Sequence, residues 1–143
     1  MSEIRIEKLQ QGDLPAVLEL LKVMMPFEFS TENAEETLAE ICKKDNYAML
    51  IAKKDGVVLG TATAICNTLL TGSFLVVEDV VVREDTRGQG VGRLLMEAID
   101  DYAKETNSDY TILVSSGFRK GAHKFYEACG YTEDVRGFRK MYI

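Results

Sequence analysis

The sequence predicts a mixed α/β fold, with a central mixed, mostly antiparallel sheet of six to seven strands flanked by about four helices. Apolar residues alternate at every second position in some segments and recur at every third or fourth position in others. The two kinds of segment follow one another in the order β-α-α-β-β-β-α-β-α-β-β, which is typical of helices packed on the faces of a sheet. The 143 residues suit one domain, and we expect residues 1–143 to form it.

The first third of the chain predicts one strand and two helices. Residues Ile4–Leu9 alternate as in a strand, and Asp13 precedes a helix with Pro15 in its first turn. The apolar stripe of this helix contains Leu14, Val17, Leu18, Leu21 and Met25. A second helix is expected from about Thr31, with an acidic outer face and with Ala34, Leu38 and Ile41 on its apolar face.

The middle and the end of the chain are rich in strands. The strands Tyr47–Lys53 and Val57–Ile65 flank an Asp55-Gly56 pair, which is a strong signal for a hairpin turn. The remaining predicted elements are a strand at Ser73–Arg83, a helix at Gly90–Thr106, a strand at Tyr110–Val114, a helix at Lys120–Cys129 that Gly130 ends, and short strands at Gly130–Thr132 and Phe138–Ile143.

Composition excludes several classes of protein. The net charge of −6 argues against nucleic acid or an anionic membrane as a partner. The first residues are charged, and no apolar run reaches the roughly 20 residues of a membrane span, so we expect a cytoplasmic protein. Cys42, Cys66 and Cys129 are far apart in the sequence, which predicts buried thiols and neither a disulfide framework nor a metal site.

The most informative segment is a glycine-rich turn between a strand and a helix. Three alternating glycines, Gly88, Gly90 and Gly92, follow the strand that ends near Val82 and open the next helix. Glycine lets backbone N–H groups approach a ligand closely, and a helix N-terminus carries about half a positive charge, so this turn is suited to a phosphate. Arg87 and Arg93 flank it. The turn lacks the Lys-Ser/Thr of a Walker A loop and the GxGxxG of a dinucleotide fold.

Two motifs together resemble those of the GNAT superfamily of N-acetyltransferases. The first is Arg87-x-x-Gly90-x-Gly92 before Leu94-Leu95, and the second is Ala-His-Lys-Phe-Tyr-Glu-Ala-Cys-Gly-Tyr at residues 122–131. The resemblance covers essentially the whole chain and implies the acyl-CoA N-acyltransferase fold, with acetyl-CoA as co-substrate and no metal. The cofactor contacts that it implies are Val80, Val81, Val82, Arg87, Gly88, Gln89, Gly90, Val91, Gly92 and Arg93.

One position departs from the family pattern. Many members have Asn three residues before the position of Ala122, where this chain has Arg119. A direct contact of Arg119 with the cofactor is therefore open. Arg119, Lys120 and Lys124 nevertheless form a local positive group, which offsets the negative total charge where an anionic cofactor is expected.

The resemblance also implies where the chemistry takes place. The strand ending at Val82 and the strand Tyr110–Val114 are expected to part and admit the thioester, with an amide near Val82 polarising its carbonyl. Glu78 is the candidate base, because strand alternation would place it on the same side as Val80, whereas Asp79 would face the other way. Glu78 could instead orient the substrate or be a surface charge.

Tyr126 occupies the position of the family's general acid, although an amphipathic tyrosine in an apolar stripe is also common packing. His123 is expected to lie at the surface. The acceptor is expected to be a primary amine of a small molecule, with a protein or peptide amine as the alternative. A non-catalytic acyl-CoA-binding module and a P-loop nucleotide-binding protein are the other interpretations. The sequence leaves a homodimer open.

Overall fold

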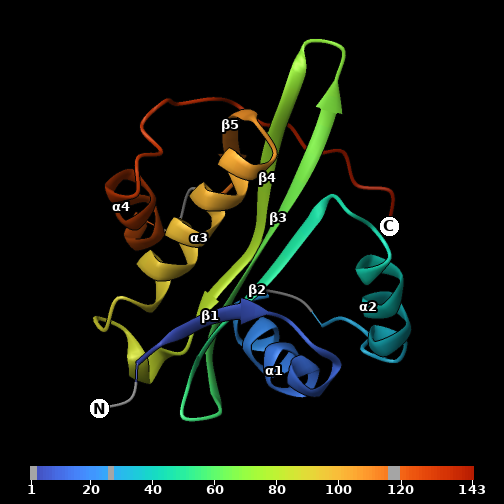
Figure 1. Ribbon diagram of the computed structural model, residues 1–143, viewed down its shortest axis with the longest axis vertical. Helices are drawn as coiled ribbons and strands as arrows, with labels where there is room; N and C mark the ends of the chain where they lie inside the picture. Colours follow the sequence, from blue (N-terminus) through green and yellow to red (C-terminus); the bar gives the residue numbers. More distant parts are fainter. Residues whose placement is uncertain (1–2, 26–27, 116–119) are drawn as a thin grey trace.

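The computed structural model describes residues 3–25, 28–115 and 120–143. Its sheet has five strands in the order β1-β2-β3-β4-β5 (Figure 1). Neighbouring strands are antiparallel from β1 to β4, whereas β4 and β5 are parallel. The strands are β1 (Arg5–Lys8), β2 (Tyr47–Lys54), β3 (Val57–Leu69), β4 (Gly72–Val82) and β5 (Ser108–Leu113). The result is the mixed, mostly antiparallel sheet that the sequence predicts.

Helices cover both faces of the sheet. They are α1 (Leu14–Met24), α2 (Ala34–Cys42), α3 (Val91–Glu105) and α4 (Lys120–Ala128), with 3-10 turns η1 (Gln11–Asp13) and η2 (Glu84–Thr86). The α1 and α2 side chains pack on Ile51 and Val58, whereas α3 packs on the neighbouring residues Ala52 and Leu59. Because consecutive strand residues point to opposite faces, α1 and α2 share one face and α3 lies on the other.

Local signals in the sequence are confirmed where they concern turns and caps. Asp55 and Gly56 both have positive φ, 52° and 78°, and join β2 to β3 in the two-residue turn that Asp-Gly favours. Gly130 ends α4 with φ 100°, and the N–H groups of Gly130 and Tyr131 donate to the carbonyls of Glu127 and Tyr126. Helix α2 begins at Ala34, three residues later than the expected Thr31.

Three expectations are wrong. The sheet has five strands rather than six to seven, because residues 130–132 and 138–143 form no strand. After α4 the chain instead crosses the sheet and ends near α2 (Figure 1), with Phe138 and Tyr142 94% and 86% exposed. A strand needs a partner strand as well as an alternating sequence, and these segments pair with none of the described residues. Cys42 is exposed at the end of α2 rather than buried.

Candidate active site

Strand β4 contains one extra residue relative to β3. Thr63 pairs with Glu78 and Thr61 pairs with Val81, so that Asp79 and Val80 together face the single residue Ala62. This is a β-bulge, and Asp79 within it has a left-handed backbone with φ 55°. The bulge shifts the alternation of every residue that follows it in β4.

The bulge changes which side chains share a face. Residues paired directly across two strands point to the same face, so Glu78 lies on the same face as Val81. Val81 packs with the α1–α2 core, whereas Val80 and Val82 pack with the α3 core. The expectation that Glu78 and Val80 share a face is therefore wrong, because it assumed an unbroken alternation along β4.

Strands β4 and β5 part beside this bulge. Their pairing ends where Val77 faces Leu113, and β5 itself ends there, while β4 continues to Val82. On its other side β4 pairs with β3 again, and the N–H of Arg83 donates to the carbonyl of Leu59 at 2.8 Å. Since N–H groups alternate along a strand, the amide of Val82 points away from β3 toward the opened edge.

The glycine turn exposes a set of backbone donors. Gly88 and Gly90 have φ of 87° and 82°, and Gly90 is the N-cap of α3, with no side chain capping the helix. A Cβ at either glycine would meet no atom within 4 Å, so the turn is open to a ligand. Some backbone N–H groups of the turn donate to no acceptor among the described residues, namely those of Gly88, Gly90, Val91, Gly92 and Arg93.

The segment before the turn is held by its own side chains. Arg83 donates to both carboxylate oxygens of Asp85, at 3.1 and 2.6 Å. The hydroxyl of the buried Thr86 donates to the carbonyl of Arg83 at 2.9 Å. These bonds fix η2 and thereby the start of the glycine turn. Arg87 is exposed and lies 3.8 Å from Glu84, and Arg93 is exposed on the first turn of α3.

Comparison with known proteins identifies the chain. Residues 14–131 match the model of the acetyltransferase (GNAT) family. The chain belongs to this family. An uncharacterized N-acetyltransferase of Bacillus subtilis is 29% identical to it over 119 residues, which are 79% of this chain and 81% of that protein. The chain is thus a GNAT acetyltransferase and not a P-loop nucleotide-binding protein.

Solved structures have the same fold. A candidate acetyltransferase of Agrobacterium tumefaciens superposes with a TM-score of 0.87 and 28% identity, over 96% of this chain and 99% of that one. An aminoglycoside N-acetyltransferase in complex with CoA superposes with a TM-score of 0.83 and 24% identity, over 98% of this chain and 96% of that one. The predicted acyl-CoA N-acyltransferase fold is confirmed.

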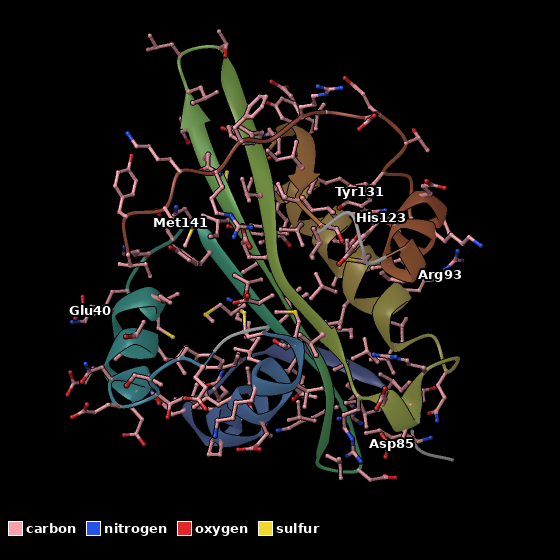
Figure 2. The ribbon with its side chains drawn as sticks, turned by 180° about the vertical axis from the view of Figure 1, so that it is seen from behind. Glu40, Asp85, Arg93, His123, Tyr131 and Met141 are labelled. Carbon is pink, nitrogen blue, oxygen red and sulfur yellow. The ribbon has the colours of Figure 1, made fainter. Side chains whose placement is uncertain are left out.

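In this GNAT protein Tyr126 lies on the face of the sheet opposite to Glu78. Tyr126 projects from α4 and packs against the α3 core, as Val80 and Val82 do. Its ring meets those of Phe125 and Tyr131 edge to face, with centroids 5.3 and 6.2 Å away. Figure 2 shows His123 on α4 with Tyr131 beside it, and Arg93 on the neighbouring α3. Arg119 lies outside the described residues, as does the side chain of Lys120.

Two carboxylates stand at the bulge. Burial raises the pKa of Glu78, the charge of Asp79 raises it further, and the charge of Arg139 lowers it. Burial likewise raises the pKa of Asp79, whose side chain is half-buried. A carboxylate with a raised pKa holds a proton more readily, which suits a general base.

The sequence did not indicate two of these features. The left-handed conformation of Asp79 belongs to the bulge in the pairing of β4 with β3, and no glycine or asparagine in the sequence marks it. The charge of Arg139 acts on Glu78 because the C-terminal segment, which the sequence predicted to be a strand, crosses the sheet. Among the described residues, no group of His, Cys, Asp and Glu could hold a metal, and no helix is long and apolar enough to cross a membrane.

Proposed function

We propose that this protein transfers the acetyl group of acetyl-CoA to the primary amine of a small molecule, by direct attack in a ternary complex. The observation that carries the proposal is the group of unpaired amides at the start of α3, next to the opened edge of β4. The amides of Gly88 and of residues 90–93 bind the diphosphate, with Gln89 in the turn and with Arg87 and Arg93 adding positive charge. The pantetheine arm lies along Val80–Val82 as an added strand.

The amide of Val82 polarises the thioester carbonyl. It points to the opened edge, and the developing oxyanion would form there as the amine attacks. A donor fixed in place by the strand stabilises this charge without reorganising during the reaction. This role requires the carbonyl to lie within hydrogen-bond distance of the amide in the complex.

Glu78 removes a proton from the acceptor amine. An alkylamine with a pKa of about 10.4 is protonated at pH 7, and forming the neutral amine costs about 4.6 kcal/mol. Glu78 lies beside the opening on the α1–α2 face and takes the proton directly or through water. Glu78 is exposed on β4, and the partial burial of its carboxylate together with the charge of Asp79 raises its pKa, which favours uptake of a proton.

Tyr126 protonates the leaving thiolate from the other face of the sheet. With the base on the α1–α2 face and the acid on the α3–α4 face, the amine and the thiol sulfur approach the opening from opposite sides. The phenol hydroxyl of Tyr126 is a proton donor and protonates the sulfur as the thiolate leaves.

The acceptor is inferred to be small. The aminoglycoside N-acetyltransferase that shares the fold acts, by its description, on a small amine. Acidic side chains also predominate near the α1–α2 face, since residues 28–45 contain six acids and two lysines, and these suit a cationic molecule.

An acceptor screen tests the proposal. Acetyl-CoA is incubated with polyamines, amino sugars, aminoglycosides, aminophosphonates and lysine peptides, and free thiol is measured. We expect thiol release with at least one small amine and none without acceptor. Release with peptides alone would replace the small molecule by a protein amine. If acetyl-CoA binds but no acceptor releases thiol, the proposed reaction is wrong.

A further inference from the structure

A cavity of about 300 Å³ lies between α1 and α2. Among the described residues, thirteen line it, of which ten are apolar and three, Ser30, Asn33 and Thr37, are polar but uncharged. Two of the apolar residues, Val17 and Leu38, are buried in the core beneath it. An apolar cavity of about 150 Å³ already holds a benzene ring, so this one has room for a ring or an alkyl chain.

Helix α2 turns its uncharged side to this cavity. The residues of α2 that line it recur at the spacing of one helix face, namely Ala34, Thr37, Leu38 and Ile41. The acids of the same helix, Glu35, Glu36 and Glu40, are exposed and are not part of the wall. These acids therefore attract a cation from outside the cavity, whereas the cavity itself suits an apolar group.

The cavity lies in register with Glu78. Met49 lines the cavity and pairs with Thr63, and Thr63 in turn pairs with Glu78. Residues paired directly across strands share a face, so these three form one row across β2, β3 and β4. Two strand spacings place the backbone of Glu78 roughly 10 Å from that of Met49. A molecule of moderate length can therefore have one end at Glu78 and the other in the cavity.

A second cavity, of about 430 Å³, differs from the first in charge and in position. It lies between β1 and α3, and its wall contains the charged residues Glu7, Lys8, Glu97 and Asp101. Ile6, which also lines it, packs with the α3 core, so this cavity lies on the face of the sheet opposite to Glu78. Of the two cavities, the one between α1 and α2 combines an uncharged wall with the face of the candidate base.

We propose that the acceptor of this protein is a primary amine with an uncharged, apolar body, which occupies the cavity between α1 and α2 while the amino group lies at Glu78. This inference rests on the proposed function. Each methylene group that enters the cavity strengthens binding about fourfold. A second charge at the far end of the molecule would enter a wall that offers it no partner. The cavity thus selects alkylamines and arylalkylamines over polyamines and aminoglycosides.

A titration tests this without turnover. The full chain is saturated with CoA and titrated with n-butylamine, n-hexylamine and n-octylamine, and with octamethylenediamine, which has the length of n-octylamine but a second ammonium group. Methyl NMR signals of Ile41 and Met49 report on this cavity, and those of Ile6 and Leu94 report on the cavity at α3. We expect n-octylamine to shift only the first pair.

The affinity should rise about fourfold with each added methylene group, and octamethylenediamine should bind at least tenfold more weakly than n-octylamine. A gain below twofold per methylene group would overturn the proposal. Equal affinity for n-octylamine and the diamine would overturn it as well.

Two alanines provide a matched pair of variants. Ala34 and Ala98 are both half-buried on a helix, and each lines one of the two cavities. Ala34→Phe should weaken binding of n-octylamine at least tenfold, because the ring fills the space, whereas Ala98→Phe should leave it unchanged. Ile41→Gln makes the wall polar without filling it and serves if Ala34→Phe does not fold. Unchanged binding of n-octylamine in either folded variant would place the alkyl chain elsewhere and overturn the proposal.

Thiol release separates this inference from the proposed function. The same amines are added to the acceptor screen, and KM should fall with chain length while kcat changes less than threefold. If amines are acetylated but n-octylamine is used no better than n-butylamine, the inference is wrong and the proposed function stands. If no amine releases thiol, the proposed function fails, while the titration still decides whether the cavity binds the apolar body of an amine.

Discussion

Gly92 in α3 lies directly against the ring of Phe125 in α4. A Cβ on Gly92 would stand 2.9 Å from Cζ of that ring and 3.2 Å from Cε1. The third glycine of the turn is therefore required by the contact between two helices, whereas Gly88 and Gly90 are required by their positive φ. One motif thus serves both packing and the proposed binding of phosphate.

This division predicts different effects for the two kinds of glycine. Gly92→Ala should lower the free energy of unfolding by about 1–3 kcal/mol, because the new methyl group overpacks the α3–α4 contact. Gly90→Val should chiefly abolish binding of acetyl-CoA, since the side chain strains the turn and covers the free amides. Urea unfolding and calorimetry on both variants make the comparison. Full affinity for acetyl-CoA in Gly90→Val would show that these amides bind nothing.

Tyr126→Phe should lower kcat by about tenfold to a hundredfold while the Kd of CoA changes less than threefold. The ring and its edge-to-face contacts remain, and only the proton donor is lost. Steady-state kinetics and calorimetry measure the two quantities. Tyr131→Phe is a suitable control, because its hydroxyl is buried and unpartnered among the described residues. A large loss of CoA affinity in Tyr126→Phe would assign Tyr126 to binding instead.

The acidic limb of the pH profile of kcat/KM should report Glu78. Arg139 lowers the pKa of Glu78, so Arg139→Gln should move the limb to higher pH. The charge of Asp79 raises that pKa, so Asp79→Asn should move the limb to lower pH. Glu78→Gln should remove it. If Arg139→Gln and Asp79→Asn shift the limb in the same direction, another group is titrating.

The ion pair between Asp13 and Lys53 should stabilise the fold in a pH-dependent manner. Burial alone would raise the pKa of Asp13, but hydrogen bonds from Lys53 and Gln10 and the charge of Lys53 lower it below its ordinary 3.8. Because the pKa of Asp13 is lower in the folded protein than in the unfolded protein, the ionised group stabilises the fold at pH values above its unfolded pKa. This contribution is lost as the pH falls through the folded pKa. The difference in Tm between wild type and Asp13→Asn should therefore shrink below about pH 4. A constant difference down to pH 2 would contradict this.

Local chemistry explains which parts of the fold were predictable. The Asp55-Gly56 turn, the end of α4 at Gly130 and the strand-to-helix glycine turn depend on neighbours in sequence, and the structure contains all three. The bulge at Asp79 depends on how β4 pairs with β3, so a prediction from unbroken alternation along β4 misplaced Glu78 relative to Val80. The expected strand at residues 138–143 failed for the same reason, because pairing is decided far away in the sequence.

The central claim is that free amides at the start of α3 bind the diphosphate of acetyl-CoA. The most direct measurement is an NMR titration of ¹⁵N-labelled protein with CoA. The account predicts that the amide signals of Gly88, Gly90, Val91, Gly92 and Arg93 shift most, together with that of Val82. Saturable binding of CoA that leaves these signals in place would contradict it.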